Sequence, residues 1–315
     1  MRSASNALKN TVAGGLKKMG PEHLFAARVR ELFGANDEIR DAGLTEPADI
    51  VNIKDLAYGN DPEQVLDIYY PSGTSRPLPV IVSVHGGGYV YGDKNLYRFY
   101  CMSLAQRGFA VVNFSYRLAP EHRFPAQLED VNSAMQFVVR HAAQYFIDTH
   151  NVFFVGDSAG AQMASQYLAA VTNPSYALLL GLEIPAFDIR ACALNCGFYI
   201  PDLHKDKMLI KCYLQKPSQV DAKEMDIAAN ITAEFPPSFV MTSNKDFLRE
   251  RAKPFVELLT SKGVEAECPA ASRPAMWVFR ELCRPRWHAA FRFLFQGPRI
   301  STAAHNCCDR PDARW

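Results

Sequence analysis

The chain contains a short apolar run, then a turn of the form G-x-S-x-G, then an alanine-rich segment with helical spacing. The run is Val152 to Val155, and the turn is Gly156-Asp157-Ser158-Ala159-Gly160. Such a run is typical of a buried strand. Glycines two residues on either side of Ser158 let a tight strand-to-helix turn approach its neighbours without a Cβ clash. The pattern therefore predicts a serine hydroxyl exposed at the end of a strand, beside a helix N-terminus.

A second strand, Leu78 to Val84, ends in a glycine run. His85 is followed by Gly86, Gly87 and Gly88. Because glycine has no side chain, the backbone N–H groups of these residues can be exposed to a ligand. Together with the amide of Ala159, the unpaired N–H groups of these glycines are candidates for stabilising an oxyanion. A glycine run alone is also compatible with a flexible loop, and G-x-S-x-G alone is a loose pattern. Their occurrence after two strands of one chain indicates an acyl-transfer site.

From Val51 onward the chain alternates apolar strand patterns with amphipathic helical patterns, which predicts an α/β fold with a mostly parallel central sheet and helices on both faces. The expected strands are Leu66 to Tyr70, Leu78 to Val84, Phe109 to Tyr116, Val152 to Val155, Cys192 to Phe198 and Ser238 to Thr242. Two helical stripes are predicted, at Leu128, Val131, Met135, Val138 and Val139 and at Leu248, Ala252, Phe255, Leu258 and Leu259. Both motifs fall where strands end, which is where such folds carry function.

The chain resembles the bacterial relatives of hormone-sensitive lipase within the α/β-hydrolases. The matching stretches are His85 to Gly88, Tyr116 to Glu121, Phe124 to Ala126 with Asp130, and Gly156 to Gly160. Ala161 stands where family members usually carry a further glycine. The resemblance covers roughly residues 45 to 267. It implies a carboxylic-ester hydrolase that favours short acyl chains, has a helical cap and uses no cofactor.

Two segments lie outside the alternation. Phe25, Val29, Leu32 and Phe33 form an apolar helical face near the N-terminus. The resemblance implies that residues 1–45 and an insertion at about 199–235 build the cap, and that residues 46–267 form the core. A peripheral helix packed on the sheet is the alternative for the N-terminal segment.

A serine hydroxyl is a weak nucleophile, so it needs a base and a carboxylate that orients the base. The resemblance assigns the carboxylate to Asp246, in the stretch Ser243 to Leu248. An aspartate there is also a favoured helix N-cap, which leaves a second reading open. The family histidine is expected about thirty residues after the acid, where this chain has none. Only His288 and His305 follow Asp246; His288 is the preferred candidate for the base, and a solvated histidine is the alternative.

The tail from Cys268 to Trp315 differs in composition from the rest of the chain. It has no lysine, although the chain has 13, and it holds 8 arginines, 4 of the 8 cysteines and all 3 tryptophans. We hypothesise that residues 268–315 are read out of frame from a GC-rich gene. A genuine basic extension that binds an acidic surface or nucleic acid is the alternative.

The 315 residues carry 34 basic and 33 acidic side chains, which is ordinary for a globular enzyme and gives no reason to expect a nucleic-acid partner. No apolar stretch is long enough to span a bilayer, and the first 20 residues lack the core of a signal peptide. We therefore expect a cytoplasmic protein with free thiols, no metal and a small-molecule ester as partner, and a homo-oligomer is left open. His305 to Cys308 lacks the paired spacing of a zinc site.

Two other functions stay open at this point. A catalytically impaired protein of the same fold would bind ligands in the same pocket, because fold does not fix function. A hydrolase of amides or carbamates would use the same tetrahedral geometry. Retention of Ser158, Asp246 and the glycine run favours the esterase, since a receptor has no chemical need for them.

Overall fold

The computed structural model describes residues 20–200, 206–214, 222–244, 246–268 and 270–271. One central sheet has the strand order β1-β2-β4-β3-β5-β6-β7-β8, and β9 pairs with β7. The pairs β1–β2 and β2–β4 are antiparallel, and the other pairs are parallel. The strands are β1 Ile50–Ala57, β2 Val65–Pro71, β3 Leu78–Val84, β4 Ala110–Phe114, β5 Ile147–Asp157, β6 Ile189–Asn195, β7 Ser238–Ser243, β8 Ala266–Glu267 and β9 Ala270–Ala271.

The register of β3 and β5 brings the two sequence motifs to the same end of the sheet. In this parallel pair, Val84 lies opposite Gly156. The ends of β3 and β5 therefore lie side by side, and the glycine run lies next to the serine turn. Both faces of this pair are buried: Val80, Val82 and Val152 pack in one core cluster, and Ile81 and Phe153 pack in the other.

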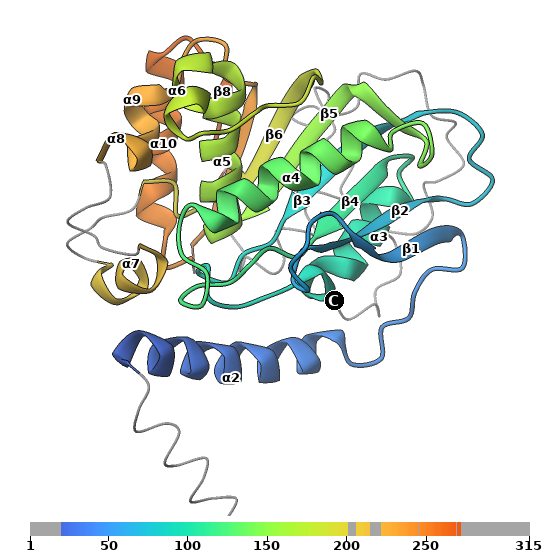
Figure 1. Cartoon of the computed structure of the whole chain (residues 1–315), viewed down its shortest axis with the longest axis horizontal. Helices are drawn as coiled ribbons and strands as arrows, with labels where there is room; N and C mark the ends of the chain where they lie inside the picture. Colours follow the sequence, from blue (N-terminus) through green and yellow to red (C-terminus); the bar gives the residue numbers. More distant parts are fainter. Residues whose placement is uncertain (1–19, 201–205, 215–221, 245, 269, 272–315) are drawn as a thin grey trace, which may run out of the picture.

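Helices cover both faces of the sheet, as predicted. One core cluster joins the sheet to α4 Ala126–Arg140, α5 Ala159–Thr172 and α10 Ala252–Ser261, and a second joins the opposite face to α3 Arg98–Ala105. Figure 1 shows α4 and α5 crossing in front of the strands. The remaining elements are η1 Lys94–Tyr97, α6 Pro174–Leu179, α7 Lys207–Tyr213, α8 Ala222–Met225, α9 Ile227–Asn230 and η2 Arg249–Arg251.

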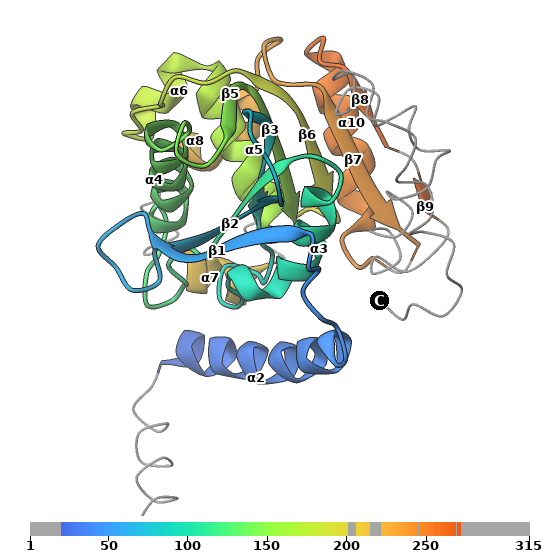
Figure 2. The ribbon, with the colours of Figure 1, turned by 90° about the vertical axis from the view of Figure 1, so that its right-hand side faces the viewer.

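Helix α2, Pro21–Asp41, lies beyond one end of the sheet in both Figure 1 and Figure 2. Phe25 and Val29 pack against the core, as the apolar face predicts. Leu32 and Phe33, from the same predicted face, are each 48% exposed. The Phe33 ring nevertheless packs edge-to-face on Tyr91, with centroids 5.8 Å apart, and the Arg30 guanidinium adds a polar contact by donating to the Val90 carbonyl at 2.7 Å.

The α/β prediction is confirmed, with differences at the strand ends. The sequence placed one strand at Val152 to Val155, but β5 extends from Ile147 to Asp157. The strand expected to reach Phe198 ends at Asn195, because Cys196 adopts a left-handed backbone with φ 44° that no strand can continue. Of the atypical tail, only residue 268 and residues 270–271 lie within the described part of the chain.

Candidate active site

Ser158 occupies a strained turn between β5 and α5. Its φ is 53° and its ψ is −115°, a combination that non-glycine residues rarely adopt. The Ser158 amide donates to the Asn195 carbonyl at 2.9 Å, and the Ser158 carbonyl accepts from the Phe198 amide at 3.1 Å. These two bonds, one to the end of β6 and one to the loop that follows it, hold the turn in place.

The glycines that flank Ser158 are required by close backbone contacts. A Cβ on Gly156 would lie 2.6 Å from the Gly160 carbonyl oxygen, and a Cβ on Gly160 would lie 2.1 Å from the Val84 carbonyl oxygen. Real Cβ atoms do not approach oxygen so closely. The G-x-S-x-G spacing is therefore a packing requirement of this turn, as the sequence predicted.

The glycine run lies beside the serine turn. The Cβ position of Gly86 is 3.3 Å from the Ser158 Cβ. Gly87 and Gly88 have φ values of 114° and 60°, which glycine adopts readily. Within the described part of the chain, the amides of Gly87, Gly88 and Ala159 donate no hydrogen bond. All three N–H groups are thus free to donate to the carbonyl oxygen of a group attacked by Ser158, where negative charge develops.

His85, which begins the glycine run, is a structural residue. Its Nδ1 donates to the Gly86 carbonyl at 2.7 Å, and its ring stacks on Tyr116 with centroids 4.0 Å apart. Burial lowers the pKa of His85 to about 4, so the imidazole is neutral near pH 7. These contacts fix the start of the glycine run, and His85 makes no hydrogen bond to Ser158.

Asp157 precedes the serine and carries a perturbed carboxyl group. The Tyr97 hydroxyl donates to Asp157 Oδ2 at 2.6 Å. Burial raises the pKa of Asp157 to about 6, the Tyr97 hydrogen bond opposes this increase, and the charge of Asp246 adds to it. Burial also raises the pKa of the Cys196 thiol, on which both carboxylates act. Two carboxylates and one thiol thus lie near the serine turn.

Asp246 follows β7 and is 8% exposed. Its Oδ2 accepts from the Thr242 hydroxyl at 2.7 Å, and its Oδ1 accepts from the Leu248 amide at 2.8 Å. The second bond closes a turn between β7 and η2. The N-cap residues of η2 and α10 are Leu248 and Arg251, and neither helix has a side-chain cap, so Asp246 does not take the capping role that the sequence left open. A carboxylate oxygen has two lone pairs, so both oxygens keep the capacity to accept a further N–H.

The predicted base, His288, lies outside the described residues. His288 belongs to residues 272–315, of which the structure says nothing. Among residues 20–200, 206–214, 222–244, 246–268 and 270–271, no histidine hydrogen-bonds to Ser158 or Asp246. The assignment of His288 therefore stays a prediction.

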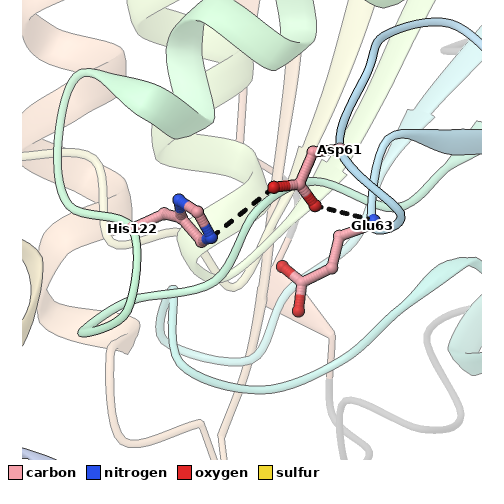
Figure 3. Close-up of side chains that lie close together, drawn as sticks. All are labelled: Asp61, Glu63 and His122. Carbon is pink, nitrogen blue, oxygen red and sulfur yellow. Dashed lines mark hydrogen bonds and ion pairs between the residues drawn. The ribbon is translucent and has the colours of Figure 1, made fainter.

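One group of side chains away from the serine has metal-ligating types. Asp61, Glu63 and His122 have ligand atoms within 4.8 Å of one another (Figure 3). Each carboxylate already accepts a backbone amide, Asp61 from Glu63 and Glu63 from Leu118. The three residues lie in surface loops, and a half-exposed group of acids does not by itself indicate a metal.

Three residues of the site were not found from the sequence: Tyr97, Asn195 and Cys196. Asn195 is 1% exposed, and neither its amide nitrogen nor its amide oxygen has a partner in the described residues. Their sequence neighbourhoods show no motif. Tyr97 reaches the site from η1, while Asn195 and Cys196 lie at the end of β6 and just after it. The left-handed φ of Cys196 also leaves no signature in a non-glycine residue.

No helix in the described ranges is long and apolar enough to cross a membrane. The chain matches the family model of the alpha/beta hydrolase fold over residues 81–272, which is more than half of its length.

Among curated proteins, the chain is 29% identical over 221 residues to carboxylesterase NlhH of Mycobacterium tuberculosis, covering 64% of this chain and 66% of that protein. It is also 29% identical to esterase LipI of the same species, over 223 residues, with the same coverage of 64% and 66%. The chain therefore spans just under two thirds of the length of these relatives.

Solved structures of esterases have the same fold. Esterase B from Lactobacillus rhamnosis, inhibited by a tributyrin phosphonate, has a TM-score of 0.70 and 25% identity, covering 80% of this chain and 84% of that chain. The esterase of Pyrobaculum calidifontis has a TM-score of 0.65 and 25% identity, covering 84% and 90%. With its glycine run and serine turn side by side, the chain belongs to the α/β-hydrolase family, in the group related to hormone-sensitive lipase.

Proposed function

We propose that this protein is a carboxylic-ester hydrolase that acts through a covalent acyl-serine intermediate. The observation that carries the proposal is the juxtaposition of a strained Ser158 with the free amides of Gly87, Gly88 and Ala159. Such donors stabilise the charge that develops on a carbonyl oxygen during nucleophilic attack. The names of the relatives, carboxylesterase and esterase, agree with this chemistry.

In the proposed reaction, the Ser158 hydroxyl attacks the ester carbonyl while a histidine takes its proton. The tetrahedral oxyanion is held by the three amides together with that of Gly86, the fourth predicted donor, whose Cβ position lies 3.3 Å from the Ser158 Cβ. Collapse of the intermediate expels the alcohol, and water then hydrolyses the acyl-enzyme by the same steps. Asp246 orients the base and stabilises the imidazolium, and His288 is the proposed base.

We further propose that α2 and α7 belong to a cap over this site, within the predicted segments 1–45 and 199–235. Leu209 of α7 lies 3.2 Å from the Cβ position of Gly88, and Tyr213 stacks on Tyr89 with centroids 3.7 Å apart. Arg30 of α2 binds the Val90 carbonyl. Apolar and aromatic groups therefore flank the glycine run on the side where the acyl chain of a substrate would lie.

Hydrolysis of p-nitrophenyl acetate tests the proposal. The parent protein should release nitrophenolate with saturation kinetics, and Ser158→Ala should lower kcat by at least about 10³-fold. Ser261→Ala, which removes an exposed hydroxyl, serves as the control and should have parent activity. His288→Ala tests the base, and a loss comparable to that of Ser158→Ala would assign it.

A folded parent without Ser158-dependent turnover would overturn the proposal. That result would favour the binding protein of the same fold that the sequence left open. Comparison of p-nitrophenyl acetate with p-nitroacetanilide distinguishes esters from amides, because the two substrates share the acyl group and differ in the leaving group.

A further inference from the structure

Tyr97 contacts the catalytic region through the side chain of Asp157. The Tyr97 hydroxyl donates to Asp157 Oδ2 at 2.6 Å, and this same oxygen lies 2.9 Å from the Cβ position of Gly86. The Asp157 carbonyl oxygen lies at 2.9 Å from that position, and the Ser158 Cβ at 3.3 Å. The Asp157 carboxyl group therefore lies between the Tyr97 hydroxyl and Gly86, the first residue of the glycine run.

Tyr97 is presented by a rigid element. It ends the short helix η1, whose first residue, Lys94, pairs through Nζ with Asp67 at 2.8 Å and with Asp55 at 2.9 Å. The Lys94 side chain is only 7% exposed, and the Asn113 side chain donates to the Lys94 carbonyl at 2.5 Å. Because η1 is anchored to the sheet by these contacts, the Tyr97 hydroxyl has a fixed position relative to β5.

The Asp157 carboxyl group has room to move if this bond is lost. A small cavity behind the serine turn is lined by Tyr97, Asp157 and Asn195, and also by Ser83, Val84, Tyr100, Val155 and Gly156. The volume of this cavity is about 10 Å³, close to the space that a single water molecule needs. The Asn195 side chain, which has no partner among the described residues, can compete for the freed carboxylate.

We propose that Tyr97 is a positioning residue, which holds Asp157 against Gly86 and thereby sets the spacing between the oxyanion amides and the Ser158 hydroxyl. This inference rests on the proposed esterase function. Without the hydroxyl of Tyr97, the Asp157 side chain turns toward the cavity and Gly86 loses its support. The amides then bind the tetrahedral intermediate less well, while the ground-state ester, which does not depend on them, binds as before.

The test uses the full chain and compares Tyr97→Phe with Tyr70→Phe. Both changes remove one phenolic oxygen, and Tyr70 lies in β2 with its ring against Phe146. With p-nitrophenyl acetate, Tyr97→Phe should lower kcat about tenfold and leave KM within twofold, which is less than the loss of a whole oxyanion donor. Tyr70→Phe should leave both unchanged.

A boronic acid gives a second readout, because it forms a tetrahedral adduct on the serine that resembles the intermediate. Its Ki should rise in Tyr97→Phe by the same factor as kcat falls. A parent-like kcat and Ki in Tyr97→Phe would overturn the positioning role while leaving the esterase proposal intact. A parent without Ser158-dependent turnover would overturn both.

Discussion

Replacement of Asp157 by asparagine should stabilise the fold at neutral pH. The asparagine side chain has nearly the same shape and keeps an oxygen for the Tyr97 hydroxyl, so the change mainly removes a charge. In the folded protein the pKa of Asp157 is raised from 3.8 to about 6, chiefly by burial. An acid whose folded pKa lies above its unfolded pKa binds more protons in the folded state, so its contribution to stability falls as pH rises between these values.

The magnitude follows from the size of the shift. A difference of about 2 pKa units corresponds to about 3 kcal/mol of unfolding free energy at pH 8, where the carboxylate is ionised in both states. At pH 4.5 the same linkage gives only about 1 kcal/mol. Because Asp157 retains some exposed surface, these figures are upper bounds.

Thermal and urea unfolding of parent and Asp157→Asn at pH 8 and pH 4.5 measures the effect. The variant should melt several degrees higher at pH 8, and the advantage should shrink toward pH 4.5. Glu234→Gln removes an exposed carboxylate and is the control, with no pH-dependent advantage expected. An Asp157→Asn variant that is less stable than the parent at pH 8, or equally stable at both pH values, would refute the reasoning.

Three further outcomes follow from the packing and electrostatics of the site. In urea unfolding, Gly160→Ala should lower the unfolding free energy by about 2 to 3 kcal/mol, because the new Cβ would lie 2.1 Å from a carbonyl oxygen. Gly181→Ala is the control: this residue has φ 66° and open space around it, so the change should cost only about 1 kcal/mol. Lys94→Met leaves Asp67 buried without its cation and should cost about 3 to 5 kcal/mol in urea unfolding; a loss below 1 kcal/mol would contradict the ion pair's role. In NMR titrations the His85 imidazole should remain neutral from pH 5 to 8, because burial lowers its pKa to about 4, and a midpoint between 6 and 7 would argue against that burial.

The sequence predicted those features of the fold and of the site that depend on residues close together in the chain. The strand Leu78–Val84 has the predicted bounds, and the flanking glycines of Ser158 are required by the contacts for which they were singled out. The fold class and the family resemblance are confirmed by the sheet and by the family match. Local signals suffice in these cases because each is a strand followed by a turn with special backbone demands.

The contacts around the serine were not predicted, because they join residues that are distant in the chain. Tyr97 reaches Asp157 across 60 positions, and Asn195 reaches Ser158 only through the pairing of β5 with β6. Helix α2 shows a second limit, because Arg30 contacts the core by donating to the carbonyls of Val90 and Ala119. A guanidinium that binds backbone carbonyls leaves no periodic signal. Cytoplasmic location, the cap boundaries and His288 stay predictions.

Labelling with a phosphonate ester tests the central claim most directly, because the label forms a stable tetrahedral adduct on an activated serine. Tryptic mass spectrometry of the labelled parent should place one phosphonyl group on the peptide that contains Ser158. The Ser158→Ala variant, with the same fold by circular dichroism, should take up none. A folded parent that remains unlabelled, or one labelled at another residue, would contradict the assignment of Ser158 as the nucleophile.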